Sequence, residues 1–134
     1  MTVREREGAP QAPAPQIESD VCDTRCLHPG AVAAAREVLP SSEVVSGSAE
    51  VFRLLGDPGR LRLLLALRAG ELCVCDLAAV SGASESSVSH SLRLLRASRA
   101  VRARREGRNV YYALHDRHIE LLLDMMTAHM GETE

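Results

Sequence analysis

Hydrophobic and polar residues recur along this 134-residue chain in patterns that predict mostly helices. Apolar segments bounded by Pro, Gly or Ser indicate helices over residues 31–39, 48–57, 60–70 and 71–82. The clearest pattern covers 84–100, where Val88, Leu92 and Leu95 recur at helical spacing and Ser84 is a good N-cap. These segments predict a small helical domain.

The helix predicted over 84–100 has a polar face opposite its apolar one, at Ser86, His90 and Arg93. Small polar side chains let a helix approach DNA bases closely, and arginine can bind guanine through two hydrogen bonds. With the helix over 71–80 and the turn at Gly82, this segment predicts a helix-turn-helix, although the helix alone could be an ordinary amphipathic surface helix. Its candidate DNA contacts are Ser86, Ser87, Ser89, His90 and Arg93.

A β-hairpin is predicted over 100–114, because "AVRAR" alternates, "EGRN" turns on Gly107 and "VYYAL" is rich in strand formers. Seven arginines and one acid lie between Arg93 and Arg108, which is a positive stripe suited to an anionic partner. Arg104, Arg105 and Arg108 would contact the DNA backbone or minor groove. The predicted fold is mainly α with a small β-hairpin, a winged helix-turn-helix.

The last predicted helix, 116–131, carries an apolar face that would lie in the seam of a homodimer, formed by Ile119, Leu122, Leu123, Met126 and Met130.

Composition narrows the class of protein. The chain is 46% hydrophobic with a net charge of −2, lacks a run long enough to span a membrane, and has no secretory signal pattern. We therefore expect a cytoplasmic protein without a membrane partner. No recognisable nucleophile and base motif points to an enzyme. Residues 1–28 are expected to be a disordered arm with a Cys/His cluster, followed by one domain over 29–134.

Four cysteines in a cytoplasmic protein indicate metal ligands or redox thiols rather than disulfides. Cys22 and Cys26 are four residues apart, with His28 as an additional candidate ligand, and Cys73 and Cys75 flank one residue. Two such pairs could form a thiolate-rich site for zinc, cadmium or lead. Buried or spare thiols remain the alternative.

Five collinear segments make the chain resemble the ArsR/SmtB family of dimeric winged-helix metal-sensing repressors: "LLGDPGRLRLLLAL", "ELCVCDLA", "SESSVSHSLRLLR", "EGRNVYYAL" and "DRHIELLLDMMTAHMGE". The resemblance implies a dimer that binds operator DNA and releases it when Zn(II), or Cd(II) or Pb(II), binds. It also implies that the N-terminal cysteine arm of one protomer meets the "CVC" segment of the other.

The resemblance further implies a metal site on the last helix, made by Asp116, His118, His129 and Glu132. His118 and His129 are eleven residues apart, so they share a helix face but are separated by about 16 Å along the axis. One chain therefore offers two half-sites, Asp116 with His118 and His129 with Glu132. Two antiparallel copies would complete two N₂O₂ sites suited to zinc. The alternative is that Asp116 only caps the helix and the others are solvated.

Two other sensing chemistries fit the same scaffold. Cys73 and Cys75 could oxidise as a thiol redox switch, or three thiolates could bind arsenite. Neither alternative gives the Asp/His/His/Glu set a role. A constitutive DNA-binding protein remains if neither metal site exists.

Overall fold

A computed structural model of the chain describes residues 19–131, in two compact units divided between Leu39 and Pro40. In the first unit, helix α1 spans Pro29–Val38, with proline at its first position, and buries none of its residues. Helix α1 confirms the helix predicted over 31–39, although it begins two residues earlier than predicted. The predicted boundary between an arm and a domain at residues 28 and 29 stays a prediction. Residues 1–18 and Glu132 lie outside the described residues.

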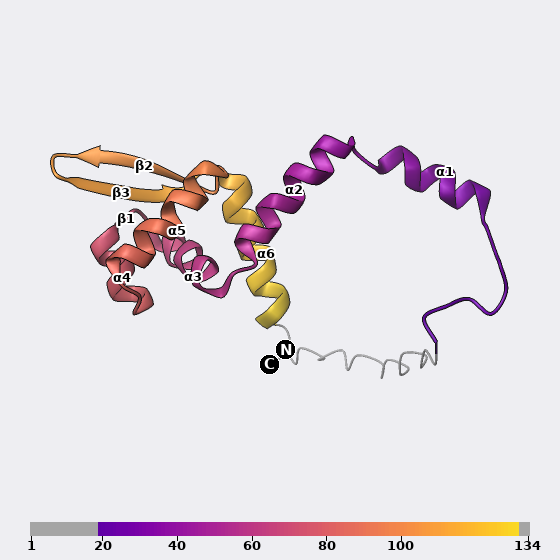
Figure 1. Cartoon of the computed structure of the whole chain (residues 1–134), viewed down its shortest axis with the longest axis horizontal. Coiled ribbons are helices and arrows are strands. Elements are labelled where there is room, and N and C mark those ends of the chain that lie inside the picture. The colour runs from indigo at the N-terminus through magenta and orange to yellow at the C-terminus, as the bar shows by residue number, and fades with distance from the viewer. Residues whose placement is uncertain (1–18, 132–134) are drawn as a thin grey trace, which may run out of the picture. The chain divides into compact units, whose positions relative to one another are not determined.

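The second unit contains the remaining helices and a three-stranded sheet (Figure 1). The elements are α2 (Ser42–Leu55), α3 (Pro58–Ala66), the 3₁₀ turn η1 (Leu67–Ala69), β1 (Leu72–Cys73), α4 (Val74–Ser81), α5 (Glu85–Ala97), β2 (Val101–Glu106), β3 (Asn109–Leu114) and α6 (Arg117–Gly131).

Side-chain caps fix where the first helices of this unit begin. Ser41 accepts the backbone N–H of Val44 at 3.3 Å, so α2 begins at Ser42 and not near residue 48 as predicted. Asp57 accepts the backbone N–H of Arg60 at 3.0 Å, and Pro58 follows it at the first position of α3. The helix predicted over 60–70 therefore starts earlier and ends in a 3₁₀ turn.

The prediction of one helix over 71–82 was wrong at its start. Leu72 and Cys73 form strand β1 and pair with Tyr112 and Tyr111 of β3. Cys73 is extended, at φ −84° and ψ 173°, and caps α4, so the helix begins only at Val74. The local pattern missed this because the pairing partner lies far along the chain, on strand β3.

The sheet has the order β1-β3-β2, and β2 and β3 form the predicted hairpin. Gly107, at φ +59°, occupies the first position of the two-residue turn, where a positive φ favours glycine. Ala103 pairs with Tyr112, and Arg104 with Tyr111. Because neighbouring residues of a strand point to opposite faces, Tyr112 packs on the core while Arg104 and Tyr111 share the other face.

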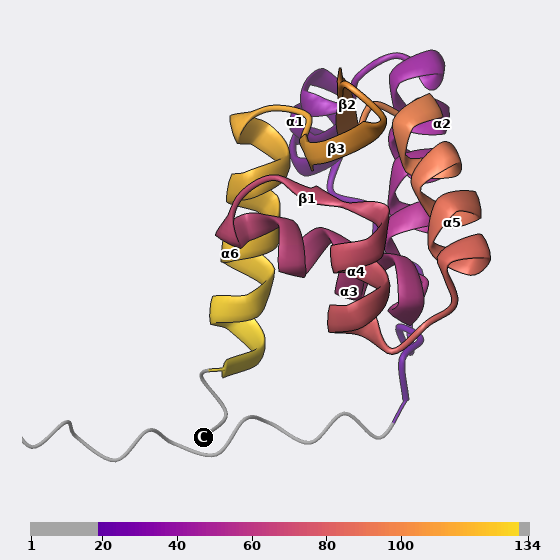
Figure 2. The ribbon, with the colours of Figure 1, turned by 90° about the vertical axis from the view of Figure 1, so that its left-hand side faces the viewer.

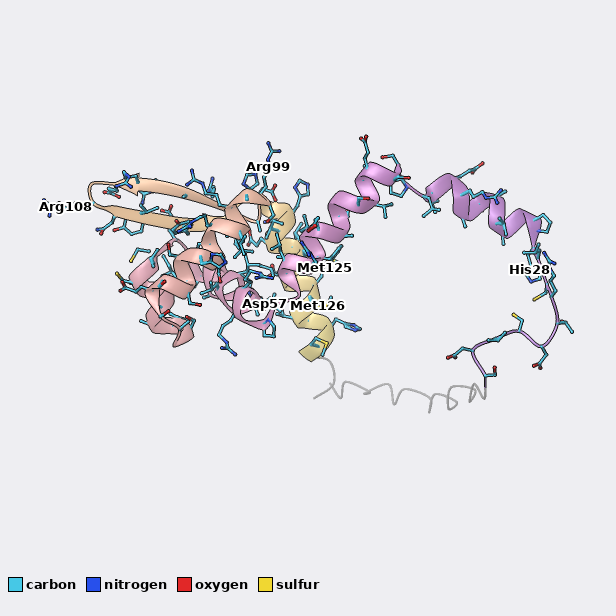
Figure 3. The ribbon with its side chains drawn as sticks, in the orientation of Figure 1. His28, Asp57, Arg99, Arg108, Met125 and Met126 are labelled. Atoms are coloured by element: carbon cyan, nitrogen blue, oxygen red, sulfur yellow. The ribbon has the colours of Figure 1, made fainter. Side chains whose placement is uncertain are left out.

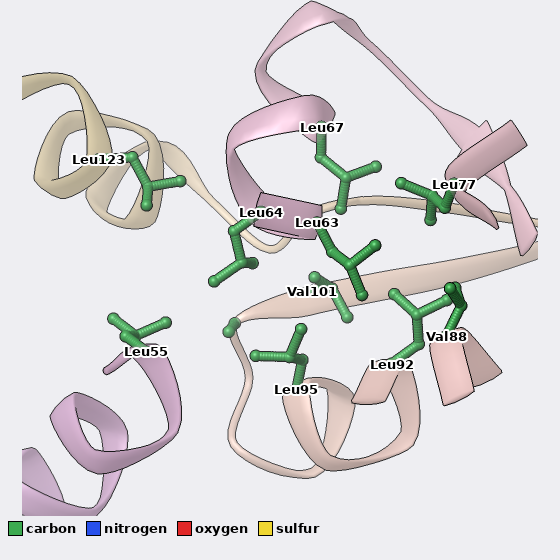
Figure 4. Close-up of a cluster of buried hydrophobic side chains, with 11 residues drawn as sticks. Leu55, Leu63, Leu64, Leu67, Leu77, Val88, Leu92, Leu95, Val101 and Leu123 are labelled. Atoms are coloured by element: carbon green, nitrogen blue, oxygen red, sulfur yellow. The ribbon is translucent and has the colours of Figure 1, made fainter. Parts of the chain in front are cut away.

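Leucine and valine side chains from the helices and from the start of β2 form the core (Figure 4). Leu64, Leu77, Leu92 and Leu95 are completely buried at its centre. In Figure 2, α5 and α6 stand on opposite sides of α3 and α4, so the core joins the helix-turn-helix to the last helix. This arrangement leaves the outer faces of α5 and α6 exposed.

Helix α6 divides its apolar residues between the core and the surface. Leu123 is buried, and Ile119 and Leu122 are half-buried against the same core, so three of the five residues predicted for a dimer seam also pack on the protomer's own core. Met126 remains exposed, together with Leu121 and Met125. Across residues 19–131, no helix is both long enough and apolar enough to cross a membrane.

Candidate DNA interface and metal-binding residues

Helix α5 has the two faces that its sequence predicts. Ser84 accepts the backbone N–H of Ser87 at 3.1 Å and begins the helix, while Val88, Leu92 and Leu95 are buried behind it. The predicted contact residues Ser86, Ser87, His90 and Arg93 are exposed, whereas Ser89 is half-buried. The structure therefore offers a polar helix face with one arginine, and Ser89 lies at its margin.

The turn between α4 and α5 is built on Gly82, whose φ of +72° is a left-handed conformation that favours glycine. Its N–H donates to the carbonyl of Ala78 at 2.9 Å and closes α4. The chain then reaches the N-cap Ser84 within two residues. This short turn makes α4 and α5 a helix-turn-helix.

The hairpin carries the predicted wing arginines in two different settings. Figure 3 shows Arg108 at the tip of the hairpin. The side chains of Arg105 and Arg108 are exposed and make no hydrogen bond or ion pair with residues 19–131, so both guanidinium groups are available to a partner.

Arg104 is held by its own chain. Its Nε and Nη2 donate to the two carboxylate oxygens of Glu71 at 3.2 and 3.1 Å, and Nη1 donates to Glu106 at 2.7 Å. Its guanidinium carbon also lies 5.0 Å from the centre of the Tyr111 ring. Hydrogen bonds from Arg104 hold the pKa of Glu71 below its usual value, and those to Glu71 and Glu106 raise the pKa of Arg104. Sequence patterns did not indicate Glu71, because its approach to Arg104 depends on the pairing of β1 with β3.

Asp116 and His118 lie together at the start of α6. Asp116 Oδ1 accepts the backbone N–H groups of His118 and Ile119 at 2.9 and 3.2 Å, and His118 Nδ1 is 3.5 Å from the same oxygen. The backbone hydrogen bond from Ile119, together with His118, holds the pKa of Asp116 below its usual value. Asp116 therefore does cap the helix, and it also adjoins an imidazole whose side chain is 93% exposed.

One stripe of α6 joins the two candidate histidines. Residues 118, 121, 125 and 129 are three or four apart, so His118, Leu121, Met125 and His129 share one helix face. Leu121 is 43% exposed and Met125 is 70% exposed, and Figure 3 marks Met125 on this helix. The helix is continuous between the histidines, which confirms the separation of about 16 Å expected along its axis. Glu132, the predicted partner of His129, lies outside the described residues.

Cys73 and Cys75 occupy the start of α4. The Cys73 sulfur accepts the backbone N–H of Asp76, while the Asp76 carboxylate accepts the N–H of Cys73 at 3.2 Å. Cys73 is half-buried, Cys75 is exposed, and both thiols are free. A hydrogen bond to Glu85, the first residue of α5, raises the pKa of the Cys75 thiol. Cys73 thus belongs to β1, and Cys75 lies next to the first residue of α5.

In the first unit, Cys22 and Cys26 are also free and exposed, as is His28 at the N-cap of α1. Over residues 19–131 no group of three or more Cys, His, Asp or Glu side chains is close enough to hold a metal ion. The candidate donors among these residues, such as Asp116 with His118 and Cys73 with Cys75, therefore occur at most in pairs.

A helix-turn-helix followed by an arginine-bearing hairpin defines a winged-helix DNA-binding regulator. The profile of the "Bacterial regulatory protein, arsR family" matches residues 57–103. The chain is 45% identical over 117 residues to a "Transcriptional repressor SmtB homolog" of Synechocystis, covering 87% of this chain and 89% of that protein. The chain belongs to the arsR family of bacterial regulatory proteins, so it is a regulator and not an enzyme.

Two further comparisons agree with this assignment. A "Cadmium resistance transcriptional regulatory protein CadC homolog" of Staphylococcus aureus is 35% identical over 117 residues, which cover 87% of this chain and 96% of that protein. The solution structure of a homodimeric winged helix-turn-helix DNA-binding domain from Mycobacterium bovis has a TM-score of 0.65 and 26% identity, covering 72% of this chain and 92% of that one.

Proposed function

We propose that this protein is a metal-responsive transcriptional repressor that binds operator DNA as a homodimer and releases it when Zn(II), or alternatively Cd(II) or Pb(II), binds. The observation that carries the proposal is the exposed stripe of α6, in which Leu121 and Met125 lie between His118 and His129. Two similar proteins, the SmtB homolog and the CadC homolog, are named as a transcriptional repressor and as a cadmium-resistance regulator. These names support the proposed function. Such a repressor would act in the cytoplasm.

The DNA contacts would come from α5 and from the tip of the wing. Arg93 would read a base in the major groove, while Ser86, Ser87, Ser89 and His90 would lie against the groove. Arg105 and Arg108, which have no partner in residues 19–131, would contact phosphates. Two protomers would present these elements to two half-sites of the operator.

The zinc-binding residues would come from both protomers. An apolar stripe such as Leu121 and Met125 is suited to packing on the same stripe of a second α6. In an antiparallel pair, Asp116 and His118 of one helix would meet His129 and Glu132 of the other, which gives two symmetric sites. These two nitrogen and two oxygen donors suit zinc, and the bound ion would supply a cross-link between the protomers.

A second, thiolate-rich site would use Cys73 and Cys75 with Cys22 and Cys26, and His28 as an additional ligand. Their sulfur donors favour cadmium, lead or zinc. The raised pKa of Cys75 implies that a metal displaces a proton there, so binding at this site should strengthen as the pH rises.

The test measures binding of the reduced protein to a duplex that the metal-free protein has selected from a randomised library. We expect tight binding without metal, and a loss of affinity of roughly 5–150-fold when zinc or cadmium is added. Arsenite and peroxide serve as comparison additions on the same sample. Release by arsenite alone, or by peroxide without metal, would replace this proposal with a thiol-based sensor. If none of zinc, cadmium, arsenite and peroxide changes the DNA affinity, the protein is a constitutive DNA-binding protein.

A further inference from the structure

Three residues form one row across the sheet and connect the candidate thiolate segment to the wing. Cys73 of β1 pairs with Tyr111 of β3, and Tyr111 pairs with Arg104 of β2. Only Leu72 and Cys73 of β1 take part in the sheet. The position of Cys73 is therefore set by a very short strand that rests directly on the hairpin.

The Arg104 side chain reinforces this connection from the outer face of the sheet. It lies over the Tyr111 ring at 5.0 Å and reaches Glu71, two residues before Cys73, with hydrogen bonds of 3.1 and 3.2 Å. Two parallel N–H donors that meet the two oxygens of one carboxylate fix both direction and distance. Arg104 thus ties β2 to the segment that leads into β1, across the width of β3.

The surroundings of Arg104 argue against a contact with DNA phosphate. Glu71 and Glu106 both accept hydrogen bonds from its guanidinium, so two carboxylates surround one positive charge. A phosphate that approached would meet the repulsion of these carboxylates. Arg105 is the next residue of the same strand and has no such partner among residues 19–131, so it is a matched comparison.

We propose that Arg104 is a positioning residue whose hydrogen bonds to Glu71 couple the Cys73 segment to the wing, and that it does not contact DNA. This inference rests on the proposed function. Cys73 is at once a candidate ligand, the N-cap of α4 and a paired residue of β1. A shift of its sulfur toward a metal would move β1, and the bonds between Glu71 and Arg104 would carry that shift into the hairpin.

The experiment uses the full chain, Cd(II) as the metal probe and a duplex selected by the metal-free wild type. Glu71→Gln, Arg104→Ala and the double variant are compared with Arg105→Ala as the control. For each protein, cadmium–thiolate absorption gives the metal stoichiometry, and DNA affinity is measured with and without cadmium over a range of salt concentrations. The ratio of the two affinities is the coupling factor.

We expect every variant to bind the same amount of cadmium. The wild-type coupling factor should lie in the range of about 5–150 that is typical of linked sites, and Glu71→Gln and Arg104→Ala should each reduce it at least threefold. The double variant should show no larger reduction than either single variant, since both act through the same pair of hydrogen bonds. Arg105→Ala should keep the wild-type factor while lowering the salt dependence of binding, by about 0.9 in logarithmic slope for each phosphate that the variant no longer neutralises.

Two results would overturn the inference alone: a coupling factor unchanged in both Glu71→Gln and Arg104→Ala, or a fall in salt dependence for Arg104→Ala equal to that of Arg105→Ala. A wild-type coupling factor of one, with zinc as well as with cadmium, would overturn the proposed function and this inference with it. Glu71→Gln keeps the shape of the side chain, so we expect its unfolding temperature to equal that of the wild type. An equal unfolding temperature shows that a reduced coupling factor reflects weaker coupling and not a damaged fold.

Discussion

The Asp116 carboxylate accepts the backbone N–H of His118 at 2.9 Å, and the same oxygen lies 3.5 Å from Nδ1 of the His118 imidazole. Both backbone N–H groups that donate to the Asp116 carboxylate do so at Oδ1, and Oδ2 accepts none from residues 19–131. The cap therefore fixes Asp116 beside His118 and leaves one oxygen for a ligand. Capping and metal binding are compatible roles for this carboxylate.

Asparagine at position 116 should separate these two roles. Asparagine is as good an N-cap as aspartate, so Asp116→Asn should keep the unfolding temperature of the metal-free protein. It removes the anionic oxygen donor, and zinc affinity should fall by about tenfold or more. Asp116→Ala should lower both quantities. Isothermal titration with zinc and thermal unfolding without metal check these outcomes, and unchanged zinc affinity in both variants would leave Asp116 with the cap alone.

A mixture of two histidine variants tests whether the α6 sites join two protomers. His118→Ala and His129→Ala should each abolish zinc binding at α6, because each removes one nitrogen from both symmetric sites. In a heterodimer of the two variants, the His129→Ala chain supplies His118 and the His118→Ala chain supplies His129. The heterodimer therefore has one complete α6 site and one α6 site without histidines. It should bind half as much zinc at α6 as the wild-type dimer.

Sites made within one chain would give no recovery in this mixture, because every chain carries a lesion. Differently tagged protomers allow the heterodimer to be purified and its zinc content measured directly. If the purified heterodimer binds no zinc at α6, the sites are not shared between two protomers.

Arg93 and Arg105 should differ in how they affect DNA binding. Arg93→Ala should weaken the selected duplex by roughly 1–3 kcal/mol relative to an unrelated duplex, as expected for a base contact. Arg105→Ala should weaken both duplexes alike and reduce the salt dependence. Fluorescence anisotropy on both duplexes at several salt concentrations distinguishes the two effects. If Arg93→Ala leaves the preference for the selected duplex intact, α5 does not read bases through this residue.

The thiolate site should lose its cadmium absorption in steps. Cys73→Ser or Cys75→Ser should remove most of the ultraviolet band of cadmium bound to thiolates, while metal-free DNA affinity stays near the wild-type value. Joint replacement of Cys22 and Cys26 by serine should reduce the number of thiolates per ion from four to two. If the cadmium spectrum is unchanged when Cys22 and Cys26 are both replaced by serine, the first unit contributes no thiolate ligand.

Arg99 has a backbone strain that glycine should relieve. Its φ of +61° is the only left-handed value among non-glycine residues from 19 to 131, at the end of α5 (Figure 3). Left-handed strain of about 1–2 kcal/mol, less the roughly 0.5–1 kcal/mol entropic cost of glycine, predicts a gain of up to about 1.5 kcal/mol in unfolding free energy for Arg99→Gly. Urea denaturation at fixed protein concentration measures it. Arg96→Gly, inside α5, is the control and should destabilise by about 1 kcal/mol.

The sequence predicted best the elements whose signals are local. The stripe of Val88, Leu92 and Leu95 and the cap at Ser84 identified α5, and Gly107 marked the turn of the hairpin. Strand β1 could not be recognised in the same way, because two residues are too few for a periodic pattern. Its extended conformation depends on pairing with Tyr111 and Tyr112, which only the folded chain brings close.

For the candidate metal site on α6, the structure bears on the spacing of the residues and leaves their role as ligands a prediction. The spacing of His118 and His129 already indicated two half-sites, and the continuous helix α6 agrees with that spacing. The role of Arg104 was harder to foresee, since a run of arginines in a hairpin suggests DNA contacts for each of them. Only the positions of Glu71 and Glu106 in the structure show that one of these arginines is already engaged.

The order of the strands leaves β2 as an edge of the sheet, since only β3 pairs with it. An uncovered edge strand offers free N–H and C=O groups on which a strand of another molecule can grow. Arg102 and Arg105 place positive charge along this edge, and the same edge of a second molecule would be repelled. We therefore expect these two arginines to oppose strand-to-strand association through this edge. Removing them together to weaken DNA binding should produce a protein that associates strand to strand, so these residues are best replaced one at a time.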